Sequence, residues 1–150
     1  WAADAQTVII VGEGGITCLF DGTSFQRIDT GVSDLLFTVH GQKNGPILAV
    51  GGANDGHAFR FDDQRWIKEP IPTGPGLNGV TILPNGSSLA VGNRGLVLYR
   101  SPEGDWDRVD LGERATIGIR TLHAVGAYGR VWSVGGELSD MTRGIIIQER

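Results

Sequence analysis

The octapeptide SLAVGNRG at residues 88–95 joins a short apolar strand to a glycine-rich turn, and the same pattern occurs four times along the chain. The other copies are TVIIVGEGG at residues 7–15, PILAVGGAN at residues 46–54 and VWSVGGEL at residues 131–138. The Val-Gly pair recurs about every 40 residues, and a repeat of this length with strand-like content is typical of a β-propeller blade. The sequence therefore predicts an all-β repeat protein.

In a whole predicted blade, three further strands accompany the Val-Gly strand and give four antiparallel strands. Two predicted blades are whole, whereas the first lacks most of its first strand and the fourth lacks its outer strand. One strand precedes the Val-Gly strand, as in LLFTVHG at residues 35–41, and another follows it, as in LVLYR at residues 96–100. Flanking Gly, Pro and Asn residues favour strands over helices in these segments. A turn rich in Asp, Gly and Ser then leads to an outer strand that an aromatic residue opens, namely Phe25, Trp66 or Trp106.

The predicted blades lie at about residues 1–29, 34–71 and 79–111, and a partial blade lies at about residues 119–150. The chain thus holds about 3.5 blades, which make a partial ring or half of a propeller of about 6–8 blades. Because stacked blades bury their faces only against neighbours, we expect an open arc to expose two sheet faces. Either the chain is a segment of a longer protein, the interpretation that we favour, or two copies self-associate to close one ring.

The predicted core consists of alternate residues of the four Val-Gly strands, which should pack between adjacent blades. These residues are Ile9, Val11, Leu48, Val50, Leu89, Val91, Trp132 and Val134. The aromatic residues of the outer strands should cover the outer hairpins. We interpret Trp66 and Trp106 as packing residues and not as platforms for a sugar.

The composition suits a turn-rich all-β protein and excludes several function classes. The chain is 40% hydrophobic, and its 24 glycines supply the residues that tight turns need. A net charge of −4 argues against general nucleic-acid binding, which normally requires a basic surface. Cys18 is the single cysteine, so the chain forms no intrachain disulfide and no thiolate zinc site. The chain contains no apolar run of about 18 residues, so we expect no membrane span.

The stretch AVGNRGLVLYRSPEGDW at residues 90–106 resembles the repeat of the sialidase-like propellers, which include photosystem II assembly and stability factors and bacterial relatives. Their repeat places a Val-Gly pair before a Ser, Asp and Gly turn and a Trp, and the first two units here are looser copies. The turn at residues 101–106 is similar to the sialidase Asp box, but it is two residues shorter and has Glu103 in the Asp position. The resemblance implies a propeller fold. The compartment stays open, with a bacterial periplasmic or secreted protein as the accompanying hypothesis.

The sequence contains no arrangement that is typical of an enzyme or a metal site, and we expect no catalysis, cofactor or metal. A sialidase-like site needs an arginine cluster, a Tyr nucleophile with a Glu partner, and an acid. Neither Tyr99 nor Tyr128 has repeating arginines beside it. His40, His57 and His123 lack the carboxylate spacing of a triad or a ligand set, so we interpret them as strand or loop histidines bonded to backbone carbonyls.

A propeller gathers the loops after its Val-Gly strands, and the loops between blades, on one face around the central channel, where we expect binding. The candidate binding residues in these loops are Glu13, Asn54, Asp55, Asn93, Arg94, Glu113, Arg114, Asp140, Met141 and Arg143. The loop GGELSDMTRG at residues 135–144 is the longest of its class. The resemblance implies that an arginine such as Arg94 meets a partner protein. Gly14 and Ala53 or Asn54 stand at the equivalent places, so an arginine patch is not repeated.

We therefore expect a non-enzymatic scaffold that binds a protein partner through this face, with the assembly of a larger complex as its role. A carbohydrate-binding or glycan-processing propeller of the sialidase-like group is the alternative. A third interpretation is that the same polar residues only solvate the loop tips. A glycan array with variants at Arg94 and Arg143 distinguishes the first two functions.

Overall fold

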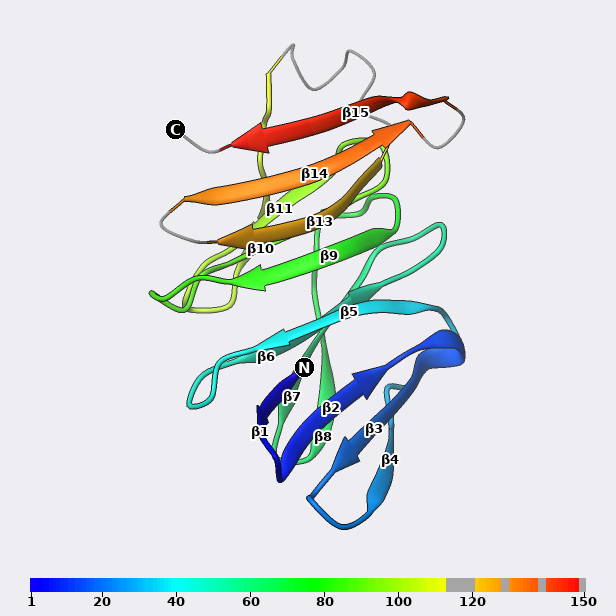
Figure 1. Ribbon diagram of the computed structural model, residues 1–150, viewed down its shortest axis with the longest axis vertical. Helices are drawn as coiled ribbons and strands as arrows, with labels where there is room; N and C mark the ends of the chain where they lie inside the picture. Colours follow the sequence, from blue (N-terminus) through cyan, green and yellow to red (C-terminus); the bar gives the residue numbers. More distant parts are fainter. Residues whose placement is uncertain (113–120, 128–129, 138–139, 149–150) are drawn as a thin grey trace.

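The computed structural model describes residues 1–112, 121–127, 130–137 and 140–148, and these residues form an all-β structure (Figure 1). Within them the only helical element is a short 3-10 turn at Glu13–Gly15. The strands form four antiparallel sheets that follow one another from the blue amino-terminal end to the red carboxyl-terminal end (Figure 1). Each sheet is a meander in which every strand pairs with the one before it. The prediction of an all-β chain of repeated antiparallel sheets is confirmed.

Each of the first three sheets has four strands. The first sheet consists of β1 (Ala2–Asp4), β2 (Thr7–Val11), β3 (Ile16–Phe20) and β4 (Phe25–Asp29). The second sheet consists of β5 (Leu36–Gly41), β6 (Ile47–Gly51), β7 (His57–Asp62) and β8 (Arg65–Glu69). The third sheet consists of β9 (Leu77–Ile82), β10 (Ser88–Gly92), β11 (Val97–Arg100) and β12 (Trp106–Arg108). The described strands of the fourth sheet are β13 (Thr121–Ala127), β14 (Val131–Glu137) and β15 (Asp140–Gln148).

The Val-Gly strands are β2, β6, β10 and β14, and each is the second strand of its sheet, as the repeat predicts. The first strand of the first sheet, β1, has three residues, whereas β5 and β9 have six residues each. The first strands of the later sheets lie side by side, because β9 packs against both β5 and β13. The second, third and fourth sheets are therefore in contact along their first strands, whereas the first sheet contacts β5 through β2.

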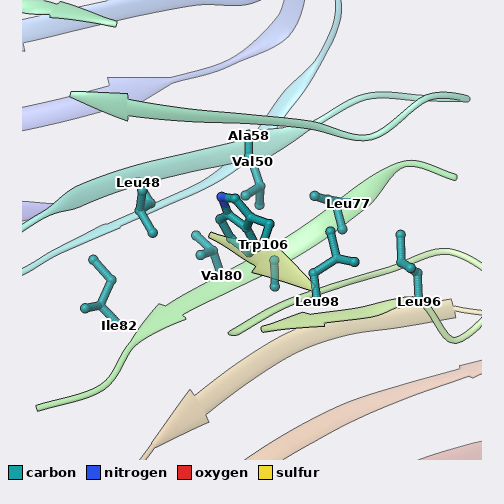
Figure 2. Close-up of a cluster of buried hydrophobic side chains, with 10 residues drawn as sticks. Leu48, Val50, Ala58, Leu77, Val80, Ile82, Leu96, Leu98 and Trp106 are labelled. Atoms are coloured by element: carbon teal, nitrogen blue, oxygen red, sulfur yellow. The ribbon is translucent and has the colours of Figure 1, made fainter. Parts of the chain in front are cut away.

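Buried apolar side chains fill the space between consecutive sheets. At the first interface, between the first and second sheets, Ile9 and Ile28 pack with Phe59 and Trp66 of the second sheet. At the second interface, between the second and third sheets, Trp106 lies among apolar side chains of both sheets (Figure 2). Each tryptophan comes from the fourth strand of its own sheet and points toward the sheet before it. The predicted packing role of these two tryptophans is confirmed.

Both indole N–H groups donate a hydrogen bond across their interface. The Nε1 atom of Trp66 lies 2.8 Å from the Oγ1 atom of Thr17, and the Nε1 atom of Trp106 lies 2.7 Å from a carboxylate oxygen of Glu69. A buried indole usually has such a partner, because an unpaired buried N–H group is costly. At both interfaces, the N–H group of a tryptophan thus donates a hydrogen bond to the preceding sheet, although the acceptors differ.

The predicted core is correct at the interfaces and wrong at the end of the chain. Ile9, Leu48, Val50 and Val91 are at most 2% exposed, and Val11 and Leu89 are half-buried. Trp132 and Val134 were expected to pack between blades, but they are 43% and 44% exposed. They lie on the face of the fourth sheet that points away from the third sheet, and no described sheet covers that face. Phe25 is 66% exposed and contacts the ring of Phe20, so it does not cover a hairpin as Trp66 does.

Candidate functional site

Backbone hydrogen bonds join two kinds of loop at one end of the sheets, and we call this end the loop face. It consists of residues 12–15, 30–35, 52–56, 70–76 and 92–95, which are the described loops after the Val-Gly strands and the loops between sheets. The amide of Gly15 donates to the carbonyl of Asp34, and the amide of Asn93 donates to the carbonyl of Gly76. Because loops of different sheets bond to each other, the loop face has a defined shape.

Asp34 is a structural junction of the loop face. Its carboxylate accepts the backbone N–H groups of Leu35 at 2.7 Å and Ala53 at 3.3 Å, and it lies 3.3 Å from the Nε2 atom of His57. The hydrogen bond from the Leu35 amide lowers the pKa of Asp34, and Ala53 and His57 lower it further. The carboxylate therefore stays ionised and ties the loop that follows β6 to the loop between the first two sheets.

A hollow of about 580 Å³ lies where the first strands of three consecutive sheets meet the loop face. We call it the inner-strand hollow, and its lining residues are Phe37, Thr38, Ala53, Asn78, Asn93, Thr121 and His123. Phe37 is 50% exposed, and His123 is exposed as well. The hollow thus offers an aromatic ring, an imidazole and side-chain amides at one place.

Hydrogen bonds hold the polar lining of the inner-strand hollow in place. The side-chain amide of Asn78 donates to the Oδ1 atom of Asn93 at 3.1 Å and to the carbonyl of Leu122 at 3.0 Å. The hydroxyl of Thr38 donates to the backbone carbonyl of Asn78 at 2.6 Å. These bonds link the second, third and fourth sheets, so the lining is pre-organised before any ligand arrives.

The sequence-predicted residues in the described loops are exposed except Asn93, which is half-buried. Glu13, Asn54 and Asp55 are exposed on the loop face, and Asn93 lines the hollow. Arg94 is also exposed, and its positive φ of 55° places it at the tip of its turn. No contact joins these residues into a single cluster in the described part of the chain.

Arg94 lines a second hollow of about 280 Å³, which we call the arginine hollow. Its other lining residues are Pro75, Gly95, Leu96, Val97, Arg108 and Val109. Arg108 is exposed, and its Nη2 atom donates to the carbonyl of Thr73 at 3.2 Å. Two arginines therefore line one hollow, and arginine side chains suit the binding of a carboxylate or another anion.

The predicted loop at residues 135–144 is wrong for most of its length. Strand β14 continues to Glu137 and β15 begins at Asp140, so Asp140, Met141 and Arg143 belong to a strand. Gly136 pairs with Gly144 and Glu137 pairs with Asp140, with a shift of register between the two pairs, so strand pairing extends into the segment. Arg143 is exposed and lies 3.7 Å from a carboxylate oxygen of Glu137. Glu113 and Arg114 lie outside the described residues.

The sequence analysis missed Phe37, Thr38, Asn78 and Thr121 of the inner-strand hollow and did not assign His123 to a site. The sequence around Phe37 and Asn78 predicts only the first strands of blades. These residues come close to one another only because three sheets pack together. One available signal is that Phe37 and His123 stand at corresponding places near the start of a first strand. Only the expectation that inner strands converge could have brought these residues together.

The histidines make contacts different from those expected. His40 accepts a hydrogen bond at Nδ1 from the amide of Ile82, and His57 faces the Asp34 carboxylate. Among the described residues, no three His, Cys, Asp or Glu side chains gather closely enough to hold a metal ion. In the same part of the chain, no helix has the length and apolar character needed to cross a membrane.

Comparison of the chain with models of protein families, with curated proteins and with solved structures found no match. The resemblance to sialidase-like propellers therefore rests on the sequence repeats, of which residues 90–106 are the best copy.

Proposed function

We propose that the four sheets are blades of a β-propeller and that the chain is a non-enzymatic scaffold that binds a protein partner through the loop face. The sequential meanders, the period of about 40 residues and the contacts between successive first strands support the blade arrangement. Assembly of a larger complex is the role that such a scaffold serves.

The inner-strand hollow is the observation that carries this proposal. It combines the half-exposed ring of Phe37 with the amides of Asn78 and Asn93 and the imidazole of His123. Exposed aromatic rings beside fixed hydrogen-bonding groups are typical of the energetic centre of a protein interface. A protruding side chain of a partner fits a hollow of about 580 Å³.

The charges of the loop face suit a protein surface. Glu13 and Asp55 are exposed acids, and Arg94 is an exposed base on the same loop face. Groups of both signs on the loop face complement the mixed charges of a folded partner and set its orientation. The proposed interface thus has a polar rim around a partly apolar centre.

Selection of a random-sequence peptide library on the purified chain tests the proposal. We expect selected peptides to lose at least tenfold in affinity on the variants Phe37→Ala and Asn93→Ala, because both remove groups that line the hollow. The variant Glu103→Ala changes an exposed residue in the turn between β11 and β12 and is the matched control. Peptides that bind all three variants equally would place recognition elsewhere and contradict the proposal.

The arginine hollow supports the alternative function, in which the chain binds a glycan. The guanidinium groups of Arg94 and Arg108 suit the carboxylate of an acidic sugar. A glycan array probed with the native chain, Arg94→Ala and Arg143→Ala separates the two functions. Binding of an acidic sugar that Arg94→Ala abolishes would favour the glycan function over the protein partner.

A further inference from the structure

An apolar cavity of about 270 Å³ lies at the third interface, between the third and fourth sheets, and we call it the third-interface cavity. Its lining includes Leu89, Val91, Val97 and Val109 of the third sheet and Val125 and Ile147 of the fourth sheet. An apolar cavity of about 150 Å³ is already large enough to admit a benzene ring. The third-interface cavity therefore has room for a large aromatic side chain.

The two preceding interfaces show what occupies the corresponding space. Trp66 fills it at the first interface and Trp106 fills it at the second (Figure 2). Figure 2 shows the Trp106 ring among Val50, Ala58 and other apolar side chains of both sheets. Both tryptophans are at most 8% exposed.

Strand pairing shows that the same positions line all three spaces. Val50 pairs with Ala58 in the second sheet, and Val91 pairs with Val97 in the third sheet. Val50 and Ala58 belong to the cluster around Trp106, whereas Val91 and Val97 line the third-interface cavity. The cavity is thus the third copy of a site that receives an aromatic ring in the first two copies.

The missing ring has a structural explanation. Trp66 and Trp106 belong to β8 and β12, which are the fourth strands of their sheets. The described part of the fourth sheet has three strands, and no described strand pairs with the outer edge of β15. Leu89, Val109 and Ile147 consequently remain only partly buried, although Leu48, the counterpart of Leu89, is fully buried.

We infer that β15 and the third-interface cavity together form a docking site for an extended polypeptide strand that carries a large aromatic side chain. The strand adds to the outer edge of β15 as a fourth strand, and its aromatic ring enters the cavity. Backbone hydrogen bonds provide affinity in this mode of recognition, and the side-chain pocket provides selectivity. The site continues the packing of the first two interfaces and is separate from the loop face.

The polarity of the third-interface cavity determines which aromatic side chain it accepts. The acceptors of the indole N–H groups at the first two interfaces are Thr17 and Glu69. Val97 corresponds to Thr17, because each pairs with the valine of its Val-Gly strand, Val91 and Val11 respectively. Val109 corresponds to Glu69, because Val109 bonds to Val97 as Glu69 pairs with Ala58, the counterpart of Val97 in the second sheet. Apolar contact therefore dominates, and both a tryptophan and a phenylalanine side chain fit the site.

A dye-labelled peptide of residues 104–111, GDWDRVDL, is the probe, because this segment contains the chain's own fourth-strand tryptophan. We expect the peptide and its Trp106→Phe version to bind the full 150-residue chain, measured by fluorescence anisotropy. The Trp106→Ala version should bind about 100-fold more weakly, a difference of about 2.7 kcal/mol, because the peptide then has no aromatic ring to bury in the cavity. Equal binding of the alanine peptide, or no binding of either aromatic peptide, would overturn the proposal.

A variant that fills the third-interface cavity provides a second test of the proposal. Leu111 follows β12, lines the cavity and is half-buried, so Leu111→Trp places a ring in the cavity from the segment after the third sheet. We expect at least tenfold weaker peptide binding with an unchanged circular dichroism spectrum. Ile10→Trp introduces the same residue on the outer face of the first sheet and should leave peptide binding unchanged. Equal loss of binding in both variants would overturn the assignment to the cavity.

Two further measurements distinguish other occupants of the site. Free indole is titrated against the chain, and binding as tight as that of the peptide would show that the cavity takes a ring without a strand. The mass of the chain without peptide is measured by light scattering. A dimer that Leu111→Trp dissociates and Ile10→Trp does not would show that a second copy occupies the site. Either result would overturn the proposal.

Discussion

The Glu69 carboxylate joins the second sheet to the third through hydrogen bonds from two side chains. Arg100 donates from Nε at 2.8 Å and from Nη2 at 2.7 Å, and Trp106 donates from its indole at 2.7 Å. The side chains of Glu69 and Arg100 are 8% and 5% exposed. Removal of the acid leaves a guanidinium group buried without its carboxylate, so Glu69→Leu should lower the free energy of unfolding by about 3–5 kcal/mol in urea denaturation.

A double variant separates the ion pair from simple packing. Glu69→Leu combined with Arg100→Leu should regain part of the lost stability, since two apolar side chains replace both buried charges while the indole N–H of Trp106 still lacks its acceptor. Trp106→Phe keeps the ion pair and loses one hydrogen bond, which costs about 1 kcal/mol. A double variant as unstable as Glu69→Leu would show that the packing of these side chains, and not the unpaired charge, determines the loss.

His40 should make the protein less stable in mild acid. Its Nδ1 atom accepts the amide hydrogen of Ile82 at 3.2 Å, which requires a neutral ring on that nitrogen. Burial lowers the pKa of His40, and the positive amino terminus lowers it further. The unfolded chain therefore takes up a proton near pH 6.5 that the folded chain resists, so the free energy of unfolding should fall as the pH decreases below about 6.5.

The variant His40→Asn tests the pH dependence. Asparagine offers an acceptor oxygen close to the place of Nδ1 but does not titrate, so the fall in stability between pH 7 and pH 5 should be smaller than in the native chain. His57 and His123 are present in both proteins, and the difference between the two curves isolates His40. Parallel curves would contradict the assignment.

At the scale of elements, the glycine of the Val-Gly pair has a steric role that depends on the first strand. A Cβ atom at Gly51 would lie 2.0 Å from the carbonyl oxygen of Leu35, whereas a Cβ atom at Gly12 would have no neighbour within 4 Å. Gly51 and Gly12 both have a φ that other residues adopt, so the two positions differ only in the space available for a side chain. The short β1 pairs only with Thr7 and Val8 and does not reach Gly12, which explains the difference.

This contrast provides a matched pair of substitutions in one chain. Gly51→Ala should lower the free energy of unfolding by about 1–3 kcal/mol, because the new methyl group forces the start of β5 away from β6. Gly12→Ala should change it by less than about 0.5 kcal/mol. Thermal and urea denaturation of both variants measures the difference. Equal effects of the two substitutions would show that the change in stability comes from the reduced backbone flexibility of alanine and not from crowding at Gly51.

The sequence could predict those elements that depend on local patterns. The strands around Val50 and Val91 follow from short apolar runs between turn residues, and the places of Trp66 and Trp106 follow from the repeat. The pairing of Gly136 with Gly144 was not predictable, because glycine-rich segments favour loops and strands alike until a partner strand is known.

The contacts between sheets could not be predicted from the sequence for a different reason. Glu69 meets Arg100, which follows it by 31 residues, and the Asn78 amide meets Leu122 after 44 residues. Neither pair has a local signature, since each residue alone resembles an ordinary strand or loop residue. The loops that carry Asn93 and Arg94 were correctly assigned, but the inner-strand hollow beside them appears only once three sheets are packed.

At the scale of the whole molecule, the first and fourth sheets each present an apolar face that no described sheet covers. The exposed residues are Ile10, Ile16 and Phe25 on the first sheet and Trp132, Val134 and Ile146 on the fourth sheet. Strand register places Val134 directly opposite Ile146, and Cys18 opposite Ile10, so each set lies on one face. The expectation that an open arc exposes two sheet faces agrees with this arrangement.

These two faces should make the isolated 150-residue chain self-associate, because contiguous exposed apolar surface favours contact with other copies. Light scattering after size exclusion should give a mass above the 16.0 kDa of one chain, and the mass should rise with concentration. Ile146→Lys or Ile10→Lys should lower it, since each places a charge on one face.

Phe37→Lys is the matched control, because Phe37 is also half-exposed but lies in the inner-strand hollow. A discrete dimer that both face variants dissociate would mean that the first sheet of one copy packs on the fourth sheet of another, so that two arcs close a ring. Larger species that either variant reduces would mean open head-to-tail stacking through the same faces. A stable 16.0 kDa monomer of the native chain would contradict the prediction, because the two apolar faces would then be tolerated in water without a partner.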